Sequence, residues 1–287
     1  MKRYRKSLLI VICFLFSVSD TDAIIVKFDY PFRNFYDLSD SRETSLRILE
    51  AELTRDTKNY NLHFVLGSLY IPVDFKKAKK EFESVIKLKP DHYLSYISLG
   101  YLTEANNNPG EAITYFKKAL SYSPNEPVIY NALATVYMRQ NKMDEAKDIL
   151  EEGIKNINSD ESLYFNQTLL LLKFYSGQKE QEKIVRNMGK AIKISPKEEY
   201  YFILGVYYLS NKRYEEARTP FENTIKTNPK NIYAILGLAT TYKETHQYDK
   251  AIELANQALT IDPNNKDVQD EIKEYEEAYK KWKEQNK

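Results

Sequence analysis

The chain has 287 residues, with 42 lysines and arginines against 41 aspartates and glutamates. This balance argues against a general nucleic-acid binder, which would show a basic excess or a basic stripe. Glycine is scarce, with 8 residues, while 29% of the residues are charged and many of the rest are helix-forming aliphatics, so an all-helical chain is favoured.

The first 23 residues have the layout of a secretory signal peptide. A basic head, "MKRYRK", precedes the apolar run "SLLIVICFLFSV" at 7–18, and two aspartates end that run. The run is too short to cross a bilayer as a helix, which takes about 20 residues. Ser19 and Ala23 each close a candidate cleavage site. We predict that residues 1–23 are a signal peptide; an uncleaved anchor is the alternative.

An aromatic segment, "IIVKFDYPFRNFYDLSD" at 24–40, follows the predicted signal peptide. It carries five aromatic side chains before any repeat, and such a run is not expected to stay fully solvated. Two interpretations are open. The segment packs on the first helix as a hydrophobic lid, or it lies in a binding groove and competes with partners.

A helical phrase recurs along the rest of the chain. "KAKKEFESVIKLKPD" at 77–91 is followed by similar stretches, among them "EAITYFKKALSYSPN" at 111–125 and "KAIELANQALTIDPN" at 250–264. The phrases end at intervals of 33 to 38 residues, most of them at a proline, which ends the helix and sets the turn to the next one. The ends are Pro90, Pro124, Asn158, Pro196, Pro229 and Pro263.

Small and large residues alternate in fixed columns of this repeat. The first helix of each unit except the fourth carries leucine followed by glycine or alanine, as in Leu99-Gly100. The second helix carries a small residue and, four positions later, usually a large one, as in Ala112 and Phe116. Residues three or four apart share a helix face. The small residues therefore let two helices approach, and the large ones fill the groove between them.

With a period near 34 residues and these columns, the chain resembles the tetratricopeptide-repeat family over about residues 41–287. The resemblance implies an all-α fold, a right-handed α-α superhelix (solenoid) of about six helical hairpins with N- and C-terminal capping helices. Stacking buries the apolar face that a lone hairpin exposes. The predicted solenoid covers 41–264, with a half-unit at 41–58 and units at about 60–92, 93–126, 127–160, 161–197, 198–230 and 231–264.

Two units depart from the pattern. The fourth is about four residues longer, lacks the Leu-Gly pair and contains "TLLLL" at 168–172, which we expect to be core. Its Asn166-Gln167-Thr168 matches a glycosylation acceptor, but the match falls inside a predicted helix and is attributed to chance. In the fifth unit, Pro220 falls inside the second helix and is expected to kink it.

The tail, 265–287, is not another repeat. An apolar stripe recurs there at spacings of four and three residues, on a helix of about six turns. We expect this helix to cap the last unit; a coiled-coil contact with a partner is the alternative. The stripe consists of Val268, Ile272, Tyr275, Tyr279 and Trp282.

No constellation for catalysis, a cofactor or a metal ion is found in the sequence. His63, His92 and His246 occupy different positions of different units, and isolated surface histidines are expected. The stretch "NNNPG" at 106–110 is typical of a turn rather than a phosphate loop. Cys13, the only cysteine, would leave with the signal peptide, so no thiol chemistry or disulfide is expected. We therefore predict a protein that is not an enzyme.

The family resemblance implies that the first helices of the units line a concave binding groove. The alternative is that Tyr101, Phe202 and Tyr233 only pack between units. The lining predicted from the resemblance consists of Phe64, Ser68, Ile71, Ile97, Tyr101, Glu104, Asn131, Thr135, Met138, Phe202, Val206, Leu209, Tyr233, Leu236, Thr240 and Lys243.

The predicted lining is mostly apolar, with scattered charges of both signs. Family members that bind acidic chain ends carry a clamp of lysine and asparagine, which this lining does not reproduce. An apolar or aromatic segment or helix of another protein is therefore the expected partner, bound with a weak dependence on salt. No nucleic acid and no membrane span after removal of the signal peptide are expected.

These observations predict an exported scaffold or assembly factor for protein–protein interaction, periplasmic or secreted and most simply placed in a bacterial envelope. One alternative is an exported structural or surface component that self-associates through the C-terminal helix. Another is a cytosolic adaptor that keeps its N-terminus.

Overall fold

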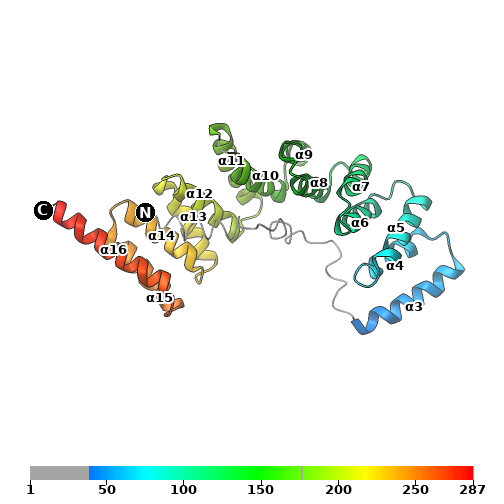
Figure 1. Ribbon diagram of the computed structural model, residues 1–287, viewed down its shortest axis with the longest axis horizontal. Coiled ribbons are helices and arrows are strands. Elements are labelled where there is room, and N and C mark those ends of the chain that lie inside the picture. Colours follow the sequence, from blue (N-terminus) through cyan, green and yellow to red (C-terminus); the bar gives the residue numbers. More distant parts are fainter. Residues whose placement is uncertain (1–38, 176, 287) are drawn as a thin grey trace. The chain divides into compact units, whose positions relative to one another are not determined.

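The computed structural model describes residues 39–175 and 177–286, and over these residues it contains fourteen α-helices and no strand (Figure 1). The chain divides into two compact units, Met1–Tyr175 and Ser176–Lys287. We call them the N-terminal and C-terminal units. The prediction of an all-helical repeat fold is confirmed. The predicted signal peptide and residues 24–38 of the aromatic segment lie outside the described residues.

Eight helices belong to the N-terminal unit. They are α3 (Ser39–Arg55), α4 (Tyr60–Tyr70), α5 (Phe75–Leu88), α6 (Tyr93–Ala105), α7 (Pro109–Tyr122), α8 (Pro127–Arg139), α9 (Met143–Asn156) and α10 (Glu161–Phe174). Helices α4 and α5, α6 and α7, and α8 and α9 pack as pairs, and each second helix also contacts the first helix of the next pair.

The C-terminal unit has six helices. They are α11 (Gln178–Ile194), α12 (Glu198–Ser210), α13 (Tyr214–Thr227), α14 (Ile232–Glu244), α15 (Tyr248–Ile261) and α16 (Lys266–Gln285). Helix α12 pairs with α13 and α14 with α15, and α16 packs on α15. Helix α13 continues through Pro220, whose carbonyl accepts a hydrogen bond from the Thr224 hydroxyl at 2.9 Å.

The turn that joins the two helices of a pair has the same backbone conformation in four of the pairs. Four non-glycine residues in the described chain have a positive φ, between 56° and 60°, and each lies two positions after the end of a first helix. Asparagine tolerates this left-handed conformation best among residues with a side chain, and two of the four are asparagines. The residues are Asn107, Asn141, Lys212 and His246.

Glycine and phenylalanine form the closest contact within a pair. A Cβ atom placed on Gly100 would lie 2.6 Å from the Phe116 ring, and one on Gly67 would lie 2.9 Å from the Phe82 ring. Both rings are fully buried, and burial of such a side chain contributes about 1.5–3 kcal/mol. The small residue of the first helix therefore leaves room for the large ring of the second helix.

A phenylalanine ring also contacts a glycine of the next helix pair. Phe221 of α13 lies against Gly205 of its own pair, and against Gly237 of the next pair, where an added Cβ would lie 2.5 Å from the ring. One buried cluster likewise joins side chains from α6 through α10, including Tyr96, Tyr130 and Leu170. The apolar core thus continues from pair to pair, as stacked repeats require.

The border between the two units falls inside the fourth predicted repeat, between α10 and α11. At the position where other first helices carry glycine or alanine, α10 carries Leu169. The irregularity seen in the sequence of this repeat therefore coincides with the division of the chain.

Helix α16 buries its apolar stripe within the chain. Val268 and Tyr275 are fully buried in a cluster with residues of α14 and α15, and Ile272 packs against that cluster. Further along, the rings of Tyr279 and Trp282 lie against Tyr248, at centroid distances of 5.3 and 5.9 Å. The stripe therefore contacts helices of its own unit.

Candidate partner-binding site

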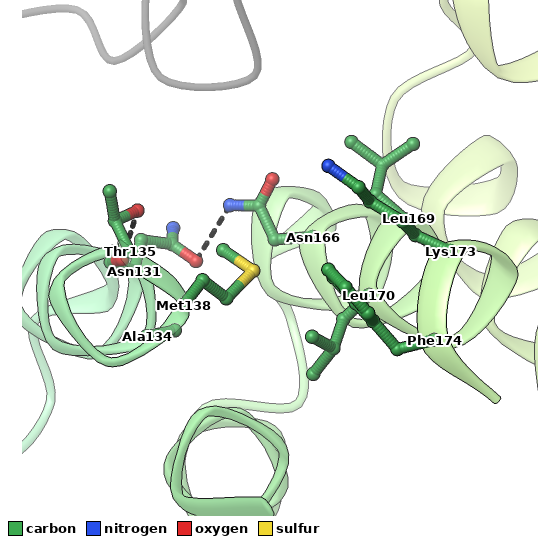
Figure 2. A pocket seen from close by; sticks show the side chains of 9 residues that line it. All are labelled: Asn131, Ala134, Thr135, Met138, Asn166, Leu169, Leu170, Lys173 and Phe174. Atoms are coloured by element: carbon green, nitrogen blue, oxygen red, sulfur yellow. Dashed lines mark hydrogen bonds between the residues drawn. The ribbon is translucent and has the colours of Figure 1, made fainter. Parts of the chain in front are cut away.

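A hollow lies on the surface between α8 and α10, the first helices of two successive repeats (Figure 2). It contains about 360 Å³ of empty space, counted to its open mouth. We call it the α8–α10 hollow. Its lining consists of Asn131, Ala134, Thr135, Met138, Asn166, Leu169, Leu170, Lys173 and Phe174.

Helical spacing explains why these side chains meet. On α8 the lining residues stand three, four and seven positions after Asn131, and on α10 the lining residues up to Lys173 stand three, four and seven positions after Asn166. Such residues share one face of a helix. The two sets are offset by 35 residues, about one repeat, so the facing helices present corresponding positions to each other.

The polar wall of the hollow is an ordered chain of hydrogen bonds. The Asn131 carboxamide accepts from Asn166 Nδ2 at 2.8 Å and donates to the Ser162 hydroxyl at 2.8 Å. Ser162 in turn donates to Asp160, whose carboxylate caps the N-terminus of α10. Thr135 donates to the Asn131 backbone carbonyl at 2.9 Å. The bonds from Asn131 to Ser162 and Asn166 hold the start of α10 against α8.

The rest of the lining is apolar except for one cation. Met138 and Leu169 are half-buried, and the Phe174 side chain is 40% exposed. The Lys173 ammonium lies 5.3 Å from the centroid of the Phe174 ring, and it forms no ion pair with any described residue. The hollow therefore offers an apolar surface with a single positive charge beside it.

Three of the predicted groove residues, Asn131, Thr135 and Met138, are brought together in this hollow. The contribution of α10 was missed, because the fourth repeat lacks the Leu-Gly pair that aligns the others. The 35-residue offset from Asn131 to Asn166 was the signal that could have found it. Within "TLLLL", Thr168, Leu170 and Leu171 are buried as expected, and Leu170 also lines the hollow together with the half-buried Leu169.

Most of the predicted groove residues of the first two repeats are packed inside the chain. Ile97 is only 1% exposed, and Ser68, Ile71 and Tyr101 are buried as well. The Phe64 ring packs against the rings of Phe82 and His92, at 5.7 and 4.9 Å.

Glu104 pairs with Arg139, whose Nη1 lies 2.9 Å from its carboxylate. Burial raises the pKa of Glu104, and the charge of Arg139 opposes that rise. This carboxylate is therefore held by an ion pair with the helix that carries Met138.

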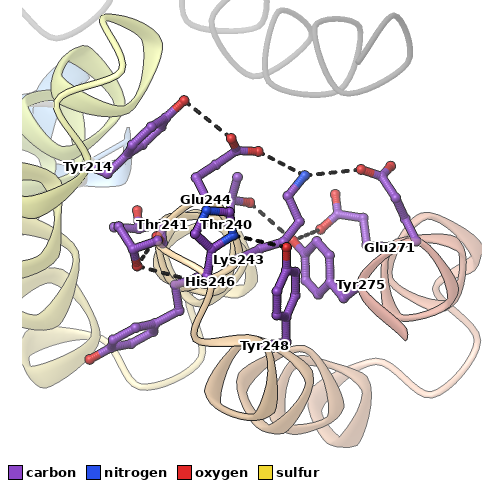
Figure 3. A network of polar contacts seen from close by, with 12 residues as sticks. Tyr214, Thr240, Thr241, Lys243, Glu244, His246, Tyr248, Glu271 and Tyr275 are labelled. Atoms are coloured by element: carbon purple, nitrogen blue, oxygen red, sulfur yellow. Dashed lines mark hydrogen bonds and ion pairs between the residues drawn. The ribbon is translucent and has the colours of Figure 1, made fainter. Parts of the chain in front are cut away.

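In the C-terminal unit, the predicted residues near α16 are used within the chain (Figure 3). The Lys243 ammonium pairs with Glu244 at 2.9 Å and with Glu274 of α16 at 3.2 Å. Thr240 Oγ1 lies 3.1 Å from the Tyr275 hydroxyl. The seam between α14 and α16 is therefore occupied by the chain's own polar side chains.

The remaining predicted residues of the C-terminal unit differ widely in exposure. Val206, Leu209 and Leu236 are buried, and Phe202 is half-buried against Phe221. Tyr233 is 59% exposed.

One of the histidine expectations was wrong. His63 is 9% exposed and is not an isolated surface residue, because its Nδ1 lies 2.6 Å from Glu81 and its Nε2 lies 3.1 Å from the Thr57 carbonyl. It fastens the loop before α4 to α5. Sequence spacing gave no sign of this, since the partners lie in different elements and the contact is not repeated.

Among the described residues, no three histidines, cysteines, aspartates or glutamates are placed to hold a metal ion. Nor does the described part of the chain contain a helix long and apolar enough to span a membrane.

Family models named "Tetratricopeptide repeat" match residues 74–127, 104–166 and 208–270, which together make up more than half of the chain. The chain belongs to the tetratricopeptide-repeat family. A tetratricopeptide-repeat protein of Methanocaldococcus jannaschii is 23% identical over 231 residues, which are 76% of this chain and 39% of that protein. The chain thus spans less than half the length of this curated relative.

Solved structures of tetratricopeptide-repeat proteins share the fold. The C-terminal part of a repeat protein from Cytophaga hutchinsonii has a TM-score of 0.68 at 15% identity, over 84% of this chain and 96% of that one. YrrB, described as a repeat protein with an unusual peptide-binding site, has a TM-score of 0.56 at 20% identity, over 68% of this chain and all of that one. Repeats of this kind form scaffolds for protein–protein interaction.

Proposed function

We propose that this protein is a non-enzymatic scaffold that binds a segment of a partner protein in the α8–α10 hollow. The observation that carries the proposal is the open, mostly apolar lining of the hollow between two successive first helices. A peptide-binding site on YrrB, a protein of the same fold, supports the proposal.

The shape and chemistry of the hollow favour an apolar or aromatic side chain as the occupant. The hollow is shallow and open to solvent, so a partner would lay a side chain against its lining rather than enter an enclosed cavity. Apolar contacts at such sites carry most of the binding free energy of protein interfaces. Since only Lys173 brings charge to the lining, binding is expected to depend weakly on salt.

Capture of a partner by the full chain tests the proposal. Leu169→Glu places a carboxylate in the hollow and is expected to weaken capture at least about ten-fold, because a charge must then be buried against the partner. The matched control is Leu88→Glu, which makes the same change at a 39% exposed leucine outside the hollow. Equal capture by wild type, Leu169→Glu and Leu88→Glu would contradict the proposal.

We further propose that the scaffold is exported and acts in the cell envelope or outside the cell. The support is the basic head and apolar run of residues 1–23. N-terminal sequencing of the protein from the producing cell tests this: a mature chain starting near residue 24 is expected, and an intact N-terminus in the cytosolic fraction would contradict export.

A further inference from the structure

Helix α3 carries apolar residues on two opposite sides. On one side, three leucines pack against the buried cluster around Phe82; they are Leu46, Leu49 and Leu53. The opposite side, two positions or about half a turn away, carries a second stripe, which we call the α3 outer stripe. It consists of Thr44, Ile48 and Ala51. All three residues are exposed, and Ile48 is 51% exposed.

The α3 outer stripe stands at the positions through which later second helices pack on their own first helix. One period of 34 residues further along the chain, α5 carries Ala78, Phe82 and Val85, and after a second period α7 carries Ala112, Phe116 and Ala119. All six of these residues are 0% exposed. Phe82 lies against Gly67 of the helix that precedes α5. The same order of small, large and small residues in α3 therefore indicates a contact with the segment that precedes α3.

The packing of α3 on α4 does not use this stripe. At the positions one period after the three leucines, α5 carries charged residues that are exposed: Lys80, Glu83 and Lys87. Helix α3 thus contacts α4 through a side that α5 leaves in water, and its outer stripe stays exposed on the described part of the chain. A helix that is apolar on two sides requires burial on both.

Residues 24–38, which lie outside the described residues, stand immediately before α3. In the other helix pairs this place in the chain belongs to the first helix, which is 11 to 13 residues long. A segment of 15 residues is long enough to take that place. It carries five aromatic side chains, whose burial against apolar residues is strongly favourable. They are Phe28, Tyr30, Phe32, Phe35 and Tyr36.

We propose that residues 24–38 pack on the α3 outer stripe of their own chain and complete the first repeat in place of a first helix. Pro31 disfavours a regular helix in the middle of this segment, so the contact is assigned to the aromatic rings. Of the two interpretations of the aromatic segment, this one places it on α3 and leaves the α8–α10 hollow to the partner. The inference does not rest on the proposed function.

The test measures how fast a thiol on the outer stripe is alkylated by a maleimide. The full chain carries Cys13→Ser, which removes the only cysteine, and then Ile48→Cys or, in a second variant, Ala51→Cys. The matched control is Leu88→Cys on α5, at a leucine that is 39% exposed. Each rate is divided by the rate of the same variant in urea. A thiol reacts only when it is accessible, so positions 48 and 51 should react at least about ten-fold more slowly than position 88.

Replacing the aromatic residues of the segment should expose the stripe. In chains that also carry Phe28→Ser, Tyr30→Ser, Phe32→Ser, Phe35→Ser and Tyr36→Ser, the rates at positions 48 and 51 should rise to within about two-fold of the control, and the rate at position 88 should not change. Circular dichroism confirms that each variant is folded.

Three results would overturn the proposal. Thiols at positions 48 and 51 that react as fast as the control in the chain with its aromatic residues would show that nothing covers the stripe. Slow alkylation that survives the five serine substitutions would assign the cover to another segment. Protection that disappears on dilution, together with dissociation of a dimer in sedimentation, would make the occupant a second copy of this chain. Capture of a partner at the α8–α10 hollow is a separate measurement, and none of these results decides it.

Discussion

Gly100 lies so close to the Phe116 ring that even a methyl group at this position has no room, with 2.6 Å from an added Cβ to the ring. Gly110, at the start of α7, has nothing within 4 Å of such a Cβ. The same substitution is therefore expected to act in opposite directions at two glycines ten positions apart.

Gly100→Ala should lower the free energy of unfolding by up to about 2 kcal/mol, because overpacking costs about 1–3 kcal/mol and better helix propensity returns about 1 kcal/mol. Gly110→Ala should raise it by up to about 1 kcal/mol, since only the gain in propensity remains. Urea unfolding followed by circular dichroism measures both. A Gly100→Ala variant that is as stable as Gly110→Ala would mean that the ring contact does not limit the small column.

At the residue scale, the sequence predicted the packing positions that recur in every repeat well, and it predicted contacts that occur only once poorly. The alternation of small and large residues is repeated, so the contact of Gly100 with Phe116 follows from helical spacing. Lys173 was missed because its repeat lacks the aligning Leu-Gly pair. The partners of His63 could not be predicted either, since a side chain reaching across a loop leaves no period in the sequence.

At the element scale, α16 is bound to its unit mainly by apolar burial and secondarily by polar contacts. Tyr275 is fully buried, and its hydroxyl lies 3.1 Å from Thr240 Oγ1 and 3.0 Å from the Glu271 carboxylate. Removing the hydroxyl alone leaves Thr240 bonded to the Leu236 carbonyl at 2.8 Å, so no new unpaired group arises there.

Tyr275→Phe is expected to cost about 1 kcal/mol of unfolding free energy, and Tyr275→Ala about 3–5 kcal/mol, since it opens a cavity under α16. Tyr279→Phe is the control on the same helix, because its hydroxyl bonds Asp249 at the exposed end of the contact, and it should change stability by less than about 0.5 kcal/mol. Urea unfolding of the full chain measures the series. If Tyr275→Ala were as mild as Tyr279→Phe, α16 would not be packed on its unit as the structure has it.

The apolar stripe of α16 was visible in the sequence as a pattern, but the pattern could not say what the stripe contacts. A cap and a coiled-coil partner require the same spacing. The contacts of Val268 and Tyr275 with α14 and α15 decide where these side chains lie in this chain.

At the scale of the whole molecule, the repeat period predicted the fold class, and the break in the period marks where the chain divides. The hollow lies on α8 and α10, and five of its nine lining residues come from the one repeat whose columns are irregular. Regular repeats could be aligned and interpreted from sequence. The irregular fourth repeat could not be aligned in this way. It lacks the small residue of its first helix, so the sequence did not show which residues of that helix face the neighbouring helices.

The central claim is that a partner contacts the chain at the α8–α10 hollow. Site-specific photo-crosslinking of the full chain in the producing cell tests it most directly, with the crosslinking side chain placed in turn at Leu169, at Phe174, at Tyr233 and at Tyr122. Tyr122 is 38% exposed and lies on α7 outside the hollow. We predict one crosslinked partner from Leu169 and Phe174, and none from Tyr122. A partner that crosslinks from Tyr233 or Tyr122 but not from Leu169 or Phe174 would contradict it.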